Sequence, residues 1–416
     1  MLIELLLVAP LLASRAQAPS TVVVSPEGPV PTIAAGIAAA RPGGRVVVRR
    51  GTYREPMIVI DKPLELIGEG WPVLDGEGRR QILAVRADDV TVRGLVLRNV
   101  GTSMTEDRAA IAVSGAARCA IESNRIEDAF FGIYLARVRA CRVMRNELRG
   151  RGRGESDSGN GIHVWTGDSV TIADNRIAGH RDGIYFEFVR NSVVRGNRSE
   201  ENVRYGLHFM YSDDCQYQRN VFRRNLAGVA VMYTKHVEMT DNRFEESWGS
   251  ASYGLLLKEI QQPVIVRNVF ARNTVGLVAD GATGIVARDN RFLANGWGIR
   301  LQSSTYGGRF ERNDFARNSF DVTTNARTSD NVFASNYFEE YRGYDLDRDG
   351  TGDVPHRPVR LFSVVQEHNP PTMILLRSLF VGVLETAERV MPVLTPELLV
   401  DASPRMRPVA AREVAP

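Results

Sequence analysis

Short runs in which apolar and polar residues alternate recur along most of the chain, and this alternation predicts a succession of β-strands. One set of runs follows a glycine and places apolar side chains at its first and third positions. A second set precedes an asparagine, typically with apolar side chains three and five residues before it and another two residues after it. These asparagines recur at spacings of 22, 29, 22, 23, 22, 26, 22, 23 and 23 residues, at Asn124, Asn146, Asn175, Asn197, Asn220, Asn242, Asn268, Asn290, Asn313 and Asn336.

A period near 22 residues, with two strand-like runs per repeat and no helical pattern between them, is typical of a right-handed parallel β-helix. Leucine-rich repeats need a different frame, and hexapeptide repeats recur far more often. We therefore predict an all-β solenoid in which one repeat forms one coil. Adjacent coils lie about 4.8 Å apart, so residues one period apart stack on one another. The predicted inward positions include Cys119, Ile121, Cys141, Val143, Val170, Ile172, Cys215, Tyr217, Val237 and Met239.

The two ends of the chain depart from this repeat. Residues 1–18 form a short apolar run that ends in Ala-Gln-Ala and resembles a secretory signal peptide, although Glu4 stands where a basic residue is usual and a mis-assigned start codon is the alternative. Residues 32–41 predict a short helix that closes the N-terminal end of the coil. We predict the β-helix over residues 19–340, and an acidic turn with a C-terminal helical tail over residues 341–416.

One face of the predicted tail helix is apolar. The face is interrupted by charged residues, which excludes a membrane span. Two interpretations stay open: the helix caps the C-terminal end of the coil, or it docks a partner. The apolar positions are Met373, Leu376, Leu379, Phe380, Val383, Leu384, Ala387 and Val390.

Composition adds two constraints. A net charge of +3 over 416 residues gives no reason to expect a nucleic-acid partner. All three cysteines occupy the same inward position of the repeat. Cys119 and Cys141 fall in adjacent coils, so a disulfide is geometrically allowed, but buried small hydrophobic thiols are the simpler interpretation and the one we prefer. Cys215 has no cysteine in a neighbouring coil.

Outward positions of the glycine-led strands carry the most unusual side chains. We predict that Met210 and Met232 stack in neighbouring coils on an exposed face, with His208 two residues from Met210. Thioether and imidazole ligands suit Cu(I). Glu187 is placed to add an oxygen ligand, and His163, two coils from His208, is predicted as a separate contact. The alternative is a protein-docking surface that binds no metal.

A second candidate metal site is the sequence Asp345-Leu-Asp-Arg-Asp-Gly-Thr-Gly-Asp353. Its spacing matches the start of a calcium-binding loop, with Asp345, Asp347, Asp349 and Asp353 as ligands. His356 stands where such loops carry a bidentate glutamate. A solvated acidic turn that binds no ion is therefore the alternative.

Signals for catalysis are weak, and we predict that the chain is not an enzyme. Many secreted β-helices cleave polysaccharides with paired carboxylates or an assisted basic residue on the outer face. The acidic residues near the predicted histidines are Asp182, Glu187, Asp213 and Asp214, and no nucleophile motif or phosphate loop accompanies them. A secreted polysaccharide lyase or hydrolase remains the runner-up function.

Several coil-specific segments resemble the NosD family, the periplasmic maturation proteins of nitrous oxide reductase. The resemblance covers residues from about 30 to about 400 and is carried by Gly-Leu-His-Phe-Met-Tyr at 206–211, Gly-Val-Ala-Val-Met-Tyr at 228–233, and the segments 159–165, 181–187, 253–258 and 343–355. It implies a β-helix of the carbohydrate-binding and sugar-hydrolase type that works with a membrane permease and a cytoplasmic ATPase of an ABC-type complex. It further implies a copper chaperone as donor, and a role in assembling the copper-sulfide centre of the reductase.

Overall fold

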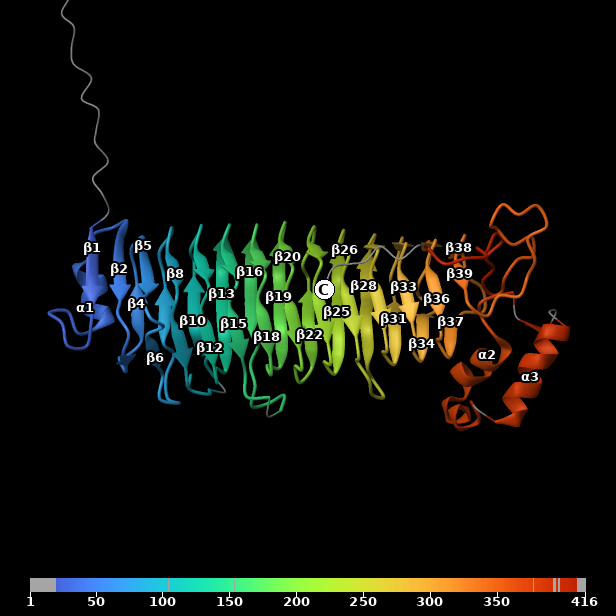
Figure 1. Cartoon of the computed structure of the whole chain (residues 1–416), viewed down its shortest axis with the longest axis horizontal. Coiled ribbons are helices and arrows are strands. Elements are labelled where there is room, and N and C mark those ends of the chain that lie inside the picture. The colour runs from blue at the N-terminus through green and yellow to red at the C-terminus, as the bar shows by residue number, and fades with distance from the viewer. Residues whose placement is uncertain are drawn as a thin grey trace, which may run out of the picture.

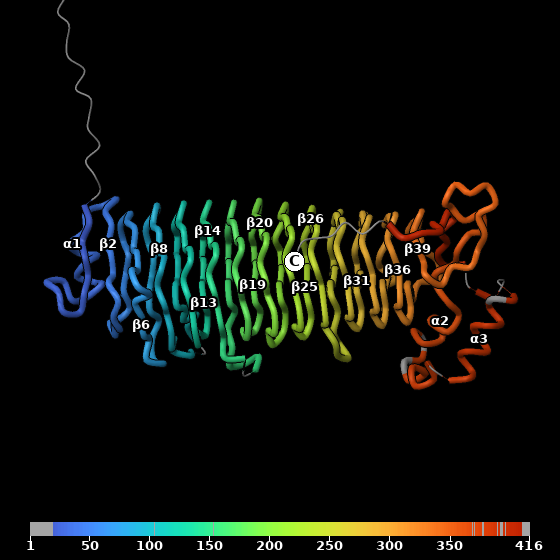
Figure 2. The backbone as a smooth tube through the Cα atoms, in the orientation of Figure 1, coloured from blue at the N-terminus to red at the C-terminus, as the bar shows by residue number. Residues whose placement is uncertain are grey.

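The computed structural model describes residues 20–103, 105–152, 154–376, 378–391, 394–395 and 397–409, and the predicted signal sequence over residues 1–18 lies outside them. Parallel strands stack into one elongated solenoid (Figure 1). Figure 2 shows successive coils following one another in chain order from the N-terminal helix to the C-terminal helices. The prediction of a parallel β-solenoid is confirmed. Each regular coil, however, contains three strands rather than the two that the sequence suggested.

Each coil contributes one strand to each of three sheets. The first sheet contains the strands that precede the ladder asparagines, from β11 on, and the four strands stacked before them: β1 (Thr21–Val24), β2 (Gly44–Val48), β5 (Leu64–Gly68), β8 (Thr91–Arg93), β11 (Ala120–Glu122), β14 (Arg142–Met144), β17 (Thr171–Ala173), β20 (Val193–Arg195), β23 (Gln216–Gln218), β26 (Glu238–Thr240), β29 (Val264–Val266), β32 (Val286–Arg288), β35 (Arg309–Glu311) and β38 (Val332–Ala334).

The second sheet contains the glycine-led strands, and its outer face carries the candidate copper ligands. Its strands are β4 (Ile58–Ile60), β7 (Leu83–Val85), β10 (Ala109–Ser114), β13 (Phe131–Arg139), β16 (Ile162–Asp168), β19 (Asp182–Arg190), β22 (Tyr205–Met210), β25 (Ala227–Lys235), β28 (Tyr253–Gln261), β31 (Val275–Asp280), β34 (Trp297–Leu301) and β37 (Phe320–Thr324).

The third sheet is made of short strands, most of which follow the ladder asparagines. They are β3 (Thr52–Tyr53), β6 (Val73–Asp75), β9 (Val96–Arg98), β12 (Arg125–Glu127), β15 (Glu147–Arg149), β18 (Arg176–Ala178), β21 (Arg198–Glu200), β24 (Val221–Arg223), β27 (Arg243–Glu245), β30 (Val269–Ala271), β33 (Arg291–Leu293), β36 (Asp314–Ala316) and β39 (Tyr337–Phe338). At two or three residues each, these strands are too short to show an alternating pattern in the sequence.

The interior is a continuous apolar core. Every inward position predicted from the asparagine register is buried, from Cys119 at 1% exposure to Met239 at 0%. Phenylalanines two residues after the ladder asparagines stack along the axis; the rings of Phe244, Phe270 and Phe292 lie 4.7 Å apart and almost parallel. The inward side chains of each coil thus pack against those of the next coil, as expected for a solenoid.

The asparagine ladder satisfies the backbone at one corner of every coil. Asn220 Nδ2 donates to the Val194 carbonyl at 2.8 Å and to Asn242 Oδ1 at 3.0 Å. The same Asn242 oxygen accepts the Asn220 backbone N–H, also at 3.0 Å. Because the ladder is buried, these bonds replace water at groups that would otherwise be unpaired. A second ladder of the same kind, which we did not predict from the sequence, is made of Asn202, Asn225, Asn273, Asn295 and Asn318.

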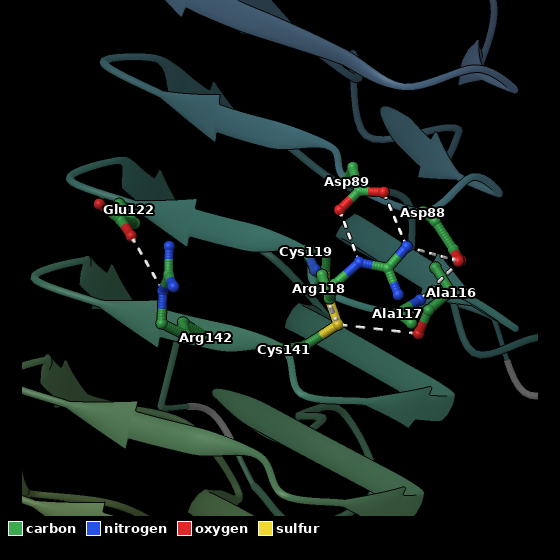
Figure 3. The surroundings of a disulfide bond; sticks show 9 residues. All are labelled: Asp88, Asp89, Ala116, Ala117, Arg118, Cys119, Glu122, Cys141 and Arg142. Carbon is green, nitrogen blue, oxygen red and sulfur yellow. Dashed lines mark hydrogen bonds and ion pairs between the residues drawn. A yellow bond between two sulfur atoms is a disulfide. The ribbon is translucent and has the colours of Figure 1, made fainter. Parts of the chain in front are cut away.

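The cysteines correct one of our predictions. Cys119 and Cys141 form a disulfide between adjacent coils (Figure 3), whereas we preferred two buried thiols. Stacking places equivalent positions of neighbouring coils close enough for the bond, with a Cα–Cα distance of 4.6 Å. Beside the disulfide, Arg118 binds the carboxylates of Asp88 and Asp89 (Figure 3). Cys215 is a buried free thiol, as predicted, and burial raises its pKa to about 12.

A helix, α1 (Ile33–Ala39), lies at the N-terminal end of the solenoid (Figure 1). Thr32 caps it by accepting the Ala35 N–H, and Ile33 and Ile37 are buried in the same core as the first strands. The structure therefore has a helix where the sequence predicted one. Its function as a cap of the solenoid stays a prediction.

The C-terminal region differs from the single helix that we predicted over residues 373–390. It contains α2 (Leu361–His368), a 3₁₀ turn, η1 (Pro370–Leu375), and α3 (Leu379–Val390), which Ser378 caps by accepting the Val381 N–H. Pro370 and Pro371 begin η1 just before the apolar pattern, and the cap at Ser378 starts a new helix within it. Among the described residues, no helix is long and apolar enough to cross a membrane.

After α3 the chain returns to the last coil. Asp401 is fully buried and accepts the backbone N–H and the side-chain amide of Asn336, each at 2.9 Å. A carboxylate thus takes the place that the next asparagine would occupy in the ladder. This closure could not be predicted from the repeat, because the residues that make it are 65 positions apart.

Candidate functional site

The outer face of the second sheet carries two neighbouring columns of side chains. Strand register stacks Met210 directly against Met232, with Glu187 on the other side of Met210. Trp165 and Lys258 occupy the ends of this column. The parallel column contains His163, Tyr185 and His208, followed by Ala230 and Leu256. The sequence therefore predicted the register of both columns.

His208 is not exposed, although the sequence analysis placed it on an exposed face. Only 7% of its surface is accessible. The rings of Tyr185 and Tyr205 each lie 4.8 Å from its imidazole, and together they cover an outward-facing side chain. Its Nε2 atom is buried and has no hydrogen-bond partner among the described residues. An unpaired ring nitrogen of this kind is suited to bind a metal ion.

An ion pair that the sequence analysis missed lies against the other ring nitrogen. Asp182 is fully buried and accepts hydrogen bonds from Arg204 at 2.9 and 2.6 Å. His208 Nδ1 lies 3.5 Å from an Asp182 oxygen and 3.4 Å from an Arg204 nitrogen. Burial alone would raise the pKa of Asp182, but the hydrogen bonds from Arg204 and His208 overcome it and hold this pKa below its usual value. Arg204 was hard to find from sequence because it lies one residue out of register with Asp182.

Met210 and Met232 are partly exposed and adjacent in register. The Tyr185 hydroxyl donates to Met210 Sδ at 3.6 Å, so Tyr185 contacts both this sulfur and the His208 ring. Glu187, next to Met210, is also partly exposed. Lys258, beyond Met232, is paired with Asp280 at 3.4 Å. Two thioethers, a carboxylate and a nearby imidazole thus share one part of the sheet.

His163 occupies a separate position. Its ring lies 4.8 Å from Tyr134 and 4.6 Å from Tyr185, which separates it from His208. Burial lowers the pKa of His163 to about 3, so its imidazole is neutral at physiological pH. Nδ1 lies 3.2 Å from the Asn160 side-chain nitrogen, and Nε2 has no partner among the described residues.

The acidic loop is the second predicted metal site. Within the part of the chain that the structure describes, Asp345, Asp347 and Asp349 are the one group of His, Cys, Asp or Glu residues with three ligand atoms within 4.8 Å of one another. It follows that the ligand atoms of His163, Glu187 and His208 do not all lie within 4.8 Å of one another. Asp353 turns its carboxylate to the Leu346 N–H at 2.7 Å and is not part of the group. The loop carboxylates also accept loop N–H groups, such as that of Gly350 at 2.9 Å.

The chain is similar to a defined family of proteins. The sequence model of the family NosD, described as "Periplasmic copper-binding protein (NosD)", matches residues 146–343. A "Probable ABC transporter binding protein NosD" from Pseudomonas aeruginosa is 31% identical over 387 residues, which cover 88% of this chain and 89% of that protein. The protein of the same name from Stutzerimonas stutzeri is 27% identical over 377 residues, or 86% of this chain and 85% of that protein.

Solved structures agree with the fold. An alginate lyase, AlyF-OU02, has a TM-score of 0.60 at 14% identity over 73% of this chain and 81% of its own. The Dettilon tailspike protein has a TM-score of 0.55 at 13% identity over 68% of this chain and 63% of its own. At such low identity these likenesses show the solenoid fold alone. The sequence relationship is more specific: given 31% identity over most of both chains, this chain belongs to the NosD family.

Proposed function

We propose that this chain is a non-catalytic periplasmic protein that binds or relays Cu(I) for the maturation of nitrous oxide reductase. In this proposal it works with a membrane permease and a cytoplasmic ATPase of an ABC-type complex, as the names of its relatives suggest. The observation that carries the copper assignment is the pair Met210 and Met232, stacked in register two residues along the sheet from the unpaired Nε2 of His208.

The side chains present fit a soft cation. Thioether sulfur and neutral imidazole are ligands that Cu(I) prefers, whereas Mg²⁺ and Ca²⁺ prefer oxygen. Asp182 and Arg204 both contact Nδ1 of His208, which leaves Nε2 as its remaining ligand atom. Such outer contacts orient a ligating histidine. Glu187 adds a negative charge beside Met210 and favours a cation there. His163 lies behind Tyr185 and is proposed as a separate copper contact that does not share an ion with His208.

Calcium is a second candidate ligand, at the acidic loop. The three carboxylates of Asp345, Asp347 and Asp349 repel one another unless a cation or solvent offsets their charge. Asp353 would have to turn from the Leu346 N–H to join them. Calorimetric titration with CaCl₂ tests this site. We expect binding that Asp347→Asn weakens, and no heat above dilution would reject calcium in favour of a solvated acidic turn.

The C-terminal helices are proposed to dock the permease. On α3, Leu379 is 90% exposed, Phe380 58% and Val383 68%, so the helix presents an apolar face that the solenoid does not cover. Figure 1 shows α2 and α3 beyond the last coils of the solenoid. Large exposed apolar surfaces mark interaction sites. We assign this role to the tail over residues 341–416 and the copper-binding role to the β-helix over residues 19–340.

Docking is tested with Leu379→Asp and Phe380→Asp in one chain. Both side chains are largely exposed, so the solenoid should stay folded while co-purification with the permease is lost. Unchanged co-purification would show that α3 is only a cap.

In this proposal a copper chaperone delivers the ion, the reductase receives it and no nucleic acid is bound.

A Cu(I) titration under reducing conditions tests the proposal as a whole. Met210→Leu with Met232→Leu keeps side-chain volume and strand fit, so stability should change little. We expect the parent to bind Cu(I) and not Zn(II), and the double variant to lose that capacity. Met144→Leu, on the first sheet, is the matched control. If the double variant binds Cu(I) as tightly as the parent, the methionines form a metal-free docking surface.

Cleavage of uronate polymers by the parent would instead support the alternative function, a polysaccharide lyase or hydrolase.

A further inference from the structure

Tyr185 contacts both kinds of candidate copper ligand. Its hydroxyl donates to Met210 Sδ at 3.6 Å, and its ring centroid lies 4.8 Å from that of the His208 imidazole. In the strand register Tyr185 pairs with His208, and Met210 follows two residues farther along that strand. The Tyr185 side chain therefore reaches diagonally across the sheet to the sulfur, a span that aromatic side chains cover between neighbouring strands.

Two imidazoles hold the Tyr185 ring in this orientation. Register stacks His163 on one side of Tyr185 and His208 on the other. The Tyr185 ring centroid lies 4.6 Å from that of His163 at an interplanar angle of 80°, and 4.8 Å from that of His208 at 64°. Edge-to-face contacts at such distances are favourable. Because the ring is packed on both sides along the column, it has little freedom to turn, and its hydroxyl stays directed at Met210.

The hydrogen bond uses the same electrons of Met210 that a copper ion would use. A thioether sulfur accepts hydrogen bonds weakly, through its lone pairs. It is also a soft ligand that binds Cu(I) by donating a lone pair. A sulfur that accepts the Tyr185 hydroxyl is therefore a poorer ligand than a free one, and the hydroxyl and the ion compete for Met210.

Competition of this kind weakens binding without removing a ligand. Only the fraction of molecules in which the Met210 sulfur is free is ready to bind, and the apparent affinity falls in proportion to that fraction. Tyr185 is partly exposed, so water can accept its hydrogen bond once the sulfur binds an ion. The exchange thus leaves no buried hydroxyl without a partner.

We propose that Tyr185 sets the Cu(I) affinity of this face by competing for the Met210 sulfur. The inference rests on the proposed function, in which Met210, Met232 and His208 bind the ion. Before copper binds, the hydroxyl is bonded to Met210; when copper takes the sulfur, the hydroxyl turns to water. A site with such an internal competitor collects Cu(I) and also releases it readily, which a relay requires.

Tyr185→Phe isolates the hydroxyl. The variant keeps the aromatic ring between His163 and His208, so the fold and both imidazole contacts should be preserved. Tyr205→Phe is the matched control. The Tyr205 ring also lies 4.8 Å from His208, but its side chain is hydrogen-bonded to Tyr253. The control therefore removes a hydroxyl from the same aromatic cluster without touching the bond to Met210.

Oxidation of the methionines tests the hydrogen bond without copper. Hydrogen peroxide transfers one oxygen atom to a lone pair of the thioether sulfur and leaves water, giving methionine sulfoxide. We expect Met210 to oxidise roughly threefold faster in Tyr185→Phe than in the parent or in Tyr205→Phe. Met232 lies two coils from Tyr185 and should react alike in all three proteins. Mass spectrometry of the peptides measures both rates, and an unchanged rate at Met210 would overturn the proposal.

Competition with a chromophoric Cu(I) chelator under reducing conditions tests the effect on binding. We expect Tyr185→Phe to bind Cu(I) about threefold to fivefold more tightly than the parent, and Tyr205→Phe to bind like the parent. Equal binding by the parent and Tyr185→Phe would overturn this inference and leave the copper assignment intact. Weaker binding by Tyr185→Phe would also overturn it, because the hydroxyl would then orient Met210 for the ion. Failure of the parent to bind Cu(I) would overturn the proposed function together with this role of Tyr185.

Discussion

The protein stacks aromatic rings in two places, once inside the solenoid and once outside it. In the interior, Phe244, Phe270 and Phe292 lie 4.7 Å apart and are at most 1% exposed. Outside, Phe188, Tyr211 and Tyr233 have nearly the same spacing but are at least 40% exposed. Burial explains the first column, because removing apolar surface from water stabilises the fold. It does not explain the second, which lies next to the candidate copper ligands.

The same contrast separates the repeated from the varied positions of the coil. Asparagine recurs at one corner from Asn124 to Asn336, because each amide has the same bonds to make. On the outer face of the second sheet, one column instead reads Trp165, Glu187, Met210, Met232 and Lys258. Stacking in the solenoid does not require this variety. We infer that the repeat supports the structure and that its variation on this face supports function.

Phe270→Ala should have the largest effect on stability. The ring is fully buried between two others, and removing it leaves a cavity in the core, which costs about 3 to 5 kcal/mol. Phe188→Ala, in the exposed column, should lower stability by about 1 kcal/mol or less. Urea unfolding followed by circular dichroism measures both. Similar losses for the two variants would contradict the distinction between the two columns.

Asn220→Ala should come next, at about 3 kcal/mol. The change removes the acceptor of the Asn197 backbone and side-chain N–H groups, and the donor to the Val194 carbonyl. Each buried polar group left unpaired costs about 1 to 3 kcal/mol. Arg219→Ala, one residue away, is the control. A loss no greater than that of the control in thermal unfolding would show that the ladder contributes little.

Asp182→Asn should lower stability by about 2 kcal/mol and weaken Cu(I) binding. It leaves Arg204, whose side chain is 26% exposed, without its carboxylate partner and removes one contact that orients His208. Since the folded pKa of Asp182 is lowered, its contribution is present above the unfolded pKa near 4 and is lost as the pH falls below it. Cu(I) affinity equal to that of the parent would show that this ion pair is only structural.

The smallest expected effect is a loss of stability in mild acid. His163, with its pKa lowered to about 3 by burial, stays neutral in the folded protein, while the unfolded chain takes up a proton below its ordinary pKa of 6.5. Stability is therefore complete above pH 6.5 and decreases between pH 6.5 and 3. We expect His163→Phe to reduce the decrease in Tm between pH 7 and 5.5 by roughly 2 °C. An unchanged pH dependence would show that His163 does not contribute.

Sequence reasoning found the features that repeat. The period located every asparagine of the first ladder, from Asn124 to Asn336, and the register of Met210 and Met232 followed from the glycines before them. It failed where contacts join residues far apart or out of phase. Asp401 closes the ladder from 65 residues away, and the Arg204–Asp182 pair crosses between coils one position out of register. The burial of His208 depends on Tyr185 and Tyr205, whose ring positions the alternation of a strand does not specify.

X-ray absorption spectroscopy of the Cu(I)-loaded protein tests the central claim most directly. If the outer face of the second sheet holds copper, the spectrum should show two sulfur ligands and one imidazole nitrogen, from Met210, Met232 and His208. The sulfur contribution should disappear in the variant that carries Met210→Leu and Met232→Leu. A copper site with only nitrogen and oxygen ligands, or a sulfur contribution unchanged in that variant, would contradict the assignment of copper to this face.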